Sequence, residues 1–142
     1  MDKYNTGMAV IGGAGSALAA AFGGWDSGLS CLLAAMAIDY ATGLIVAGVF
    51  HNSPKSTNGS LESRAGWKGL FRKGGTLLVL LLAVQLDTVL GTTIIRDGVV
   101  IAYIANEVIS ITENLGLMGV PIPAVIKKAI DILKEKEEKN NE

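Results

Sequence analysis

Acidic residues inside membrane-length apolar runs place the strongest constraint on what this chain can fold into. Asp39, Asp87 and Glu107 each lie in a run long enough to cross a bilayer, and none of these runs contains a basic residue. A carboxylate in hydrocarbon costs roughly 2.5–3.5 kcal/mol on insertion scales. We therefore expect these acids to be protonated, or to face one another, a helix bundle or water.

The composition predicts an integral membrane helical protein of the all-α class. Half of the 142 residues are hydrophobic and 18% are charged, and the mean hydropathy is +0.45. The single Cys31 excludes an intramolecular disulfide, and the single His51 excludes a histidine metal cluster. We find no phosphate-binding loop and expect no catalytic residue, cofactor or metal. The net charge of −1 gives no indication of nucleic acid binding.

We expect four transmembrane helices, at 7–24, 30–50, 77–95 and 99–120. Three spans remain if the Gly- and Ala-rich first segment does not cross. That segment also has a superficial likeness to a signal peptide, although Asp2 offsets Lys3 before it. A short amphipathic helix over 124–133 completes a membrane domain of residues 1–133, and 134–142 form a charged tail.

Small residues recur every four positions in the first three spans, a spacing that lets helix backbones approach closely in lipid. In two spans an acid shares the stripe, so that Asp39 and Asp87 lie on faces that another helix can approach. The predicted packing residues are Gly12, Ser16, Ala20, Gly24, Gly43, Ala47, Ala83 and Gly91.

Polar residues at helical spacing give the fourth span a face that suits protein or water rather than lipid. We interpret this face, together with the acids of the second and third spans, as the lining or assembly surface of an aqueous oligomer. The alternative is a set of protonated, hydrogen-bonded carboxyls within one bundle. The candidate residues are Asp39, Asp87, Asn106, Glu107, Ser110, Glu113 and Asn114.

The hydrophilic break at 51–75 carries five bases against Glu62 alone. The positive-inside rule places this loop in the cytoplasm, and with four spans both termini follow it there. An interfacial helix over 61–73 that contacts anionic headgroups is a second interpretation. The predicted topology or headgroup residues are Lys55, Arg64, Lys68, Arg72 and Lys73.

Several motifs together resemble the phage holin family of the toxin secretion and phage lysis type, which includes the holin-like protein of clostridial toxin loci. They cover most of the chain from Trp25 to Leu133. The matching elements include Gly24-Trp25-Asp26, Asp39-Tyr40-Ala41-Thr42-Gly43-Leu44, Ser53-Pro54-Lys55-Ser56, Gly66-Trp67-Lys68-Gly69, Leu86-Asp87, Asn106-Glu107 and Gly119-Val120-Pro121-Ile122-Pro123. The resemblance implies a homo-oligomer in the bacterial cytoplasmic membrane. It would permeabilise the membrane at a set time, so that an endolysin or a large toxin leaves the cytoplasm, with no need for direct contact.

Two rival interpretations stay open at this point. A small ion- or proton-coupled transporter would also have about four short helices and a membrane acid, and it predicts saturable, gradient-driven flux. A membrane anchor or lysis regulator would bind a partner through residues 124–142, and it predicts no permeabilisation by this chain alone.

Overall fold

The computed structural model describes residues 2–140, which contain five helices and no strand. The all-α prediction is therefore confirmed for these residues. The helices are α1 (Lys3–Ala21), α2 (Ser27–Gly48), α3 (Ser63–Leu90), α4 (Ile94–Leu117) and α5 (Ala124–Asn140).

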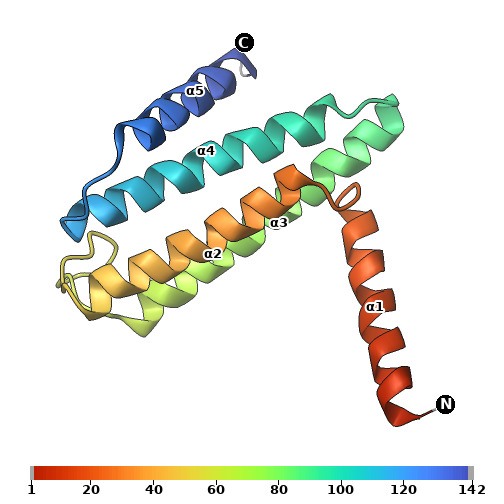
Figure 1. Ribbon diagram of the computed structural model, residues 1–142, viewed down its shortest axis with the longest axis horizontal. Coiled ribbons are helices and arrows are strands. Elements are labelled where there is room, and N and C mark those ends of the chain that lie inside the picture. Colours follow the sequence, from red (N-terminus) through yellow and green to blue (C-terminus); the bar gives the residue numbers. More distant parts are fainter. Residues whose placement is uncertain (1, 141–142) are drawn as a thin grey trace.

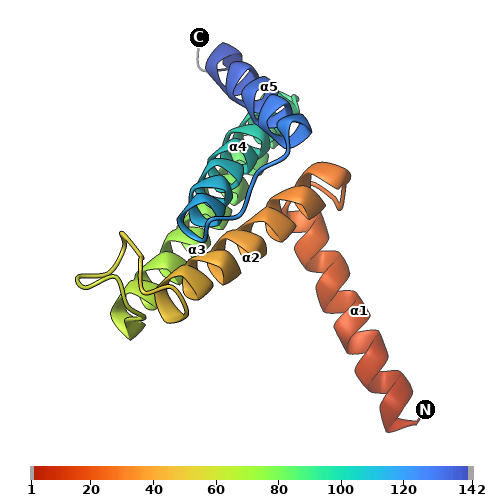
Figure 2. The ribbon, with the colours of Figure 1, turned by 60° about the vertical axis from the view of Figure 1, so that its left-hand side comes forward.

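Helix α4 is the centre of the packing. It contacts α2, α3 and α5, whereas α2 and α3 have few contacts with each other. Helices α2, α3 and α4 run side by side, and α1 projects away from them (Figures 1 and 2). Burial of apolar surface, worth about 25 cal/mol per Å², holds the bundle together. The core cluster comprises Leu29, Leu32, Met36, Leu80, Val100 and Ile104.

Helices α2 and α3 are the two in the described chain that are long and apolar enough to cross a membrane. Helices α1 and α4, expected as the first and fourth spans, do not meet the same criterion of length and composition. For α4 the reason is its charge, because its 24 residues include one base and three acids. The structure therefore supports membrane character and leaves the prediction of four spans unconfirmed.

The hydrophilic break is shorter than predicted, because α3 already begins at Ser63. Pro54 and the positive-φ Gly59 lie before this point, and no proline follows within the helix, so nothing interrupts it. At 1.5 Å per residue its 28 residues extend about 42 Å. This length exceeds a hydrocarbon core of about 30 Å. The basic first turns are continuous with the apolar part of the same helix.

The turn between α3 and α4 also differs from the expectation. The spans expected at 77–95 and 99–120 place a turn at Arg96-Asp97-Gly98, but the chain turns at 91–93 and these three residues belong to the start of α4. Gly91 ends α3 in the left-handed conformation with φ +67°, which glycine adopts without steric cost. Helix α5 likewise continues past Leu133 to Asn140, so most of the expected tail is helical. Residues 141–142 lie outside the described part.

Candidate functional site

Lys73 joins three helices inside the bundle. Its Nζ on α3 donates to Asp39 Oδ2 on α2 at 2.8 Å and also to Glu107 Oε2 on α4. The two acids are buried, with 6% and 5% exposure. Buried charges are tolerated when they are paired in this way. The expectation that these acids lack a basic partner holds only within their own apolar runs, because the partner comes from the segment that we had assigned to a cytoplasmic loop.

Asn114 provides a second tie between α2 and α4. Its Nδ2 donates to Asp39 Oδ1 at 3.1 Å, to the Asp39 backbone oxygen at 3.3 Å and to Thr42 Oγ1 at 3.0 Å. Gly43 faces this amide, and a Cβ there would lie at an ordinary contact distance of 3.8 Å from Asn114 Nδ2. Asp39 thus receives donors from both neighbouring helices, and its face of α2 points at protein rather than lipid.

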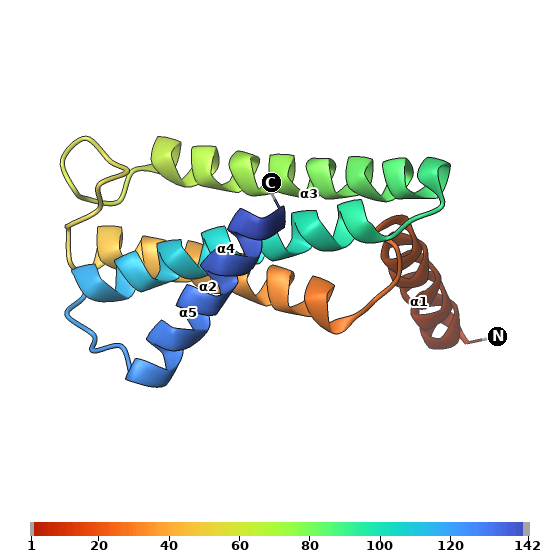
Figure 3. The same ribbon diagram turned by 90° about the horizontal axis from the view of Figure 1, so that it is seen from above.

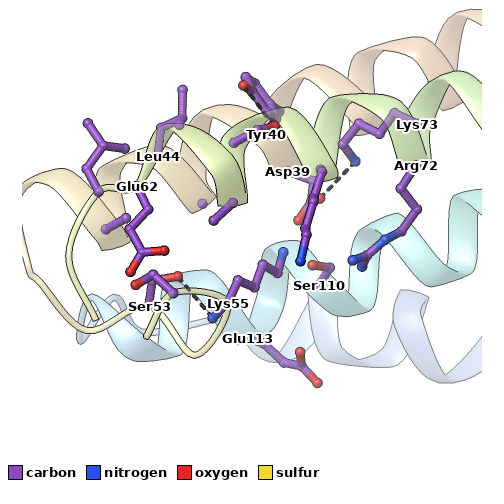
Figure 4. A pocket seen from close by; sticks show the side chains of 18 of the residues that line it. Asp39, Tyr40, Leu44, Ser53, Lys55, Glu62, Arg72, Lys73, Ser110 and Glu113 are labelled. Atoms are coloured by element: carbon purple, nitrogen blue, oxygen red, sulfur yellow. Dashed lines mark hydrogen bonds and ion pairs between the residues drawn. The ribbon is translucent and has the colours of Figure 1, made fainter. Parts of the chain in front are cut away.

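A cavity of about 360 Å³ opens beside the Lys73 network, between α2, α3, α4 and the connection that precedes α3. Figure 4 shows the side chains of Lys55 and Arg72 extending into it near Asp39 and Ser110. Lys68 adds a further base to the wall. The walls also include five of the predicted polar residues, Asp39, Asn106, Glu107, Ser110 and Glu113.

Hydrogen bonds order the connection that covers this cavity. Thr57 donates to Glu62 Oε1 through its amide at 2.9 Å and its hydroxyl at 2.6 Å. The hydrogen bond from the Thr57 hydroxyl is the main cause of the lowered pKa of Glu62. Tyr40 Oη donates to the Gly66 carbonyl oxygen at 3.4 Å, which ties the start of α3 to α2.

Asp87 does not join this site. It lies fourteen positions beyond Lys73 on α3, about 21 Å along the helix. Its carboxylate accepts the backbone N–H groups of Ile95 and Arg96, at 3.1 and 2.7 Å, and the Thr92 hydroxyl at 2.5 Å. Asp87 therefore satisfies amides of the first turn of α4 that have no intrahelical partner. The seven predicted polar residues do not form one continuous face in this protomer.

Another base, the buried Arg96, fixes the corner between α1 and α2. Its guanidinium donates to Asp26 Oδ2 at 2.7 Å and to the carbonyl oxygens of Phe22, at 2.7 Å, and Gly24, at 3.2 Å. This guanidinium is the main cause of the lowered pKa of Asp26. Gly23 has φ +81°, and a Cβ there would lie 2.7 Å from Arg96 Nε, so the corner requires glycine.

Our sequence interpretation missed Arg96, which we had placed in a turn. One signal was available, because Arg96 is the only base between residues 74 and 126. A lone base in such an apolar region has few carboxylates to choose from. The position of Asp26 just after two glycines was the complementary hint. The sequence does not show, however, that the segment with Asp26 and the segment with Arg96 lie side by side.

The predicted small-residue stripes have different surroundings. In α2, Ala47 is buried and Gly43 faces Asn114. In α3, Ala83 is buried, whereas Gly91 is the exposed end of the helix. Along α1, Gly12, Ser16 and Ala20 are exposed, and Gly24 lies at the corner with Arg96. Arg64 is exposed on the first turn of α3 and does not line the cavity beside Lys73.

Comparison with known proteins shows which family and which relatives the chain is similar to. Residues 16–135 match the family described as the bacteriophage holin family. A probable holin of Bacillus phage phi105 is 36% identical over 80% of this chain and 79% of its own length. An uncharacterised protein of Halalkalibacterium halodurans is 41% identical over 83% of this chain and 86% of its own. A 14.9 kDa protein encoded in the nagH 3′ region of Clostridium perfringens is 43% identical over 81% of this chain and 83% of its own length. No solved structure matches the chain.

Proposed function

Because the chain belongs to the bacteriophage holin family, we propose that it accumulates in the bacterial cytoplasmic membrane, oligomerises, and permeabilises the membrane at a set time. The lesion would let an endolysin or a large toxin leave the cytoplasm, and neither protein would need to bind this chain. The family match carries this proposal, and it is not a match to an enzyme family.

We propose a multi-pass arrangement in which α2, α3 and α4 cross the bilayer and the connection before α3 faces the cytoplasm. The bases Lys55, Arg64, Lys68 and Arg72 support this orientation by the positive-inside rule, and their side chains would contact anionic headgroups. With α1 as a fourth span, both termini are cytoplasmic. The exposed small-residue stripe of α1 would then pack against another protomer.

The Lys73 network gives the protomer a way to remain harmless before it assembles. Asp39 and Glu107 are buried and paired, so the protomer presents neither carboxylate to lipid. Bases and polar groups already line the adjoining cavity. We propose that assembly separates α2, α3 and α4 around this cavity, so that its walls come to line the aqueous lesion.

The proposal is tested by induced expression in a bacterial host without other lysis genes, with viability and membrane potential followed over time. Abrupt depolarisation after a delay, and lysis once an endolysin is co-expressed, are expected. Continued growth with the protein verified in the membrane would contradict the proposal and favour a transporter or a regulator.

Variants of the network sharpen this experiment. D39N and E107Q keep side-chain size, insert normally, and shift or abolish the time of lysis, because they change the groups that Lys73 holds. The matched control is D131N, which changes an exposed acid on α5 outside the network. Unchanged timing in both network variants would rule out the role assigned to this cavity.

A further inference from the structure

Helix α5 folds back along α4 on the outside of the bundle, toward the half that carries α1 (Figures 1 and 3). Ile130 is buried, and Leu133 packs against the core cluster. That cluster includes Leu29 and Leu32, which are near the start of α2 and far from the connection before α3. The part of α5 beyond Leu133 therefore lies at the depth of the central turns of the bundle.

This position conflicts with a bilayer around α2, α3 and α4. Within residues 134–140, the charged side chains are exposed apart from the partly buried Glu137. With α5 docked on α4, they would face the acyl chains, where charged side chains are strongly unfavourable. The residues concerned are Lys134, Glu135, Lys136, Glu137, Glu138 and Lys139.

The apolar surface of α5 is also wider than its contact with α4. At 100° per residue, all the apolar residues of its first ten positions except Ala124 lie within an arc of about 160°. Docking on α4 covers the edge of the arc where Ile130 and Leu133 lie. Val125 and Ile132, at the other edge, stay 77% and 56% exposed. A flat lipid surface would cover the whole arc at once.

We infer that α5 leaves α4 in the membrane-inserted protein and lies on the lipid surface at the end of the bundle that carries the basic connection. The apolar arc enters the boundary between headgroups and acyl chains. Lys127 and Lys128 flank the arc on either side and reach anionic headgroups. The charged residues after Leu133 then remain in water. This inference rests on the proposed insertion of α2–α4, and the partner that it assigns to α5 is an anionic lipid surface.

Single cysteines distinguish the possible positions of α5. In full-length protein carrying C31S, the variants I130C, I132C and D131C are reconstituted at low density into phosphatidylglycerol–phosphatidylcholine vesicles. Their reaction rates with a membrane-impermeant maleimide are compared. A lipid-bound α5 protects I130C and I132C alike, by roughly tenfold relative to D131C, because both side chains lie in the arc. Replacing Lys127 and Lys128 with Gln should raise the I132C rate.

Each other pattern would overturn the inference. Protection of I130C with fast I132C means that α5 stays docked on α4. Fast reaction of both means that α5 is free in water. Protection of I132C only at high protein density means that another copy covers it. Extraction of the protein by alkaline carbonate would instead reject the membrane insertion on which the inference rests, and that result is read separately from the labelling rates.

Discussion

The bundle holds one buried base, Arg96, and one partly buried base, Lys73, and their partners differ in kind. Arg96 binds two backbone carbonyl oxygens and the half-exposed Asp26, all within the short connection between α1 and α2. Lys73 binds two buried carboxylates that come from different helices. Backbone carbonyls cannot ionise, so the Arg96 site keeps two of its contacts whatever the charge of Asp26. The Lys73 site consists of three ionisable groups beside a cavity, and it can therefore change its pairing during assembly.

Removing the Lys73 ammonium should have the largest effect, because it leaves two buried carboxylates without a cation. For K73M we expect a loss of roughly 3–5 kcal/mol in the free energy of unfolding, measured in detergent micelles. The control R64M changes an exposed base and should cost little. The triple variant K73M/D39N/E107Q removes all three charges and should recover most of the loss. Equal stability of K73M and R64M would refute the buried network.

R96K should have a smaller effect, because it keeps the charge but loses the planar fork that reaches three oxygens. We expect a loss of about 1.5–3 kcal/mol, the usual contribution of a hydrogen bond to a charged group. Protease cleavage within residues 22–26 should become faster, since α1 would no longer be held at the corner. The matched control is R64K, which changes an exposed arginine on the first turn of α3 that does not line the cavity. Unchanged cleavage in R96K would show that the corner does not depend on the guanidinium.

The same comparison explains which parts of the structure the sequence could predict. Apolar runs and four-residue spacing indicated the helices and the face of α2 that carries Asp39 and Gly43. Asp39 and Glu107 are each 34 residues from Lys73, so no local pattern joins them. The prediction of a loop at Lys73 was wrong, because five bases suggested water. The alternative of a helix over 61–73 was nearer, since α3 begins at Ser63 and continues through Lys73 into the bundle. Arg96 was missed for the converse reason, since the partners that it binds at the corner, Phe22, Gly24 and Asp26, are 70 or more residues away.

Asp87 lies near Arg96 and tests whether the α3–α4 turn belongs to the fixed part of the molecule. In wild type the two carboxylate oxygens of Asp87 accept different amides, those of Ile95 and Arg96. In D87N one of these oxygens becomes an NH2 group, which cannot accept a hydrogen bond, so one of the two amides loses its partner. We expect faster hydrogen exchange at these two amides and a smaller loss of stability than in K73M. The matched control is D97N, which changes an exposed acid on the same turn of α4. Comparable protection of both amides in D87N and wild type would exclude the capping role.

The pH dependence of the Asp26–Arg96 pair should give the smallest effect. The Arg96 guanidinium lowers the pKa of Asp26 below its ordinary value of 3.8. A carboxyl with a lowered pKa in the folded state stabilises the protein above pH 3.8, and this contribution is lost as the pH falls through the lowered pKa. Because Asp26 is 49% exposed, solvent screening keeps the contribution below about 1 kcal/mol. D26N should therefore be slightly less stable than wild type at pH 6, and the two unfolding midpoints should converge below pH 3.8. A constant difference between them down to about pH 2 would mean that the effect of D26N does not come from the charge of Asp26, since Asn can still cap α2 by accepting the Leu29 amide.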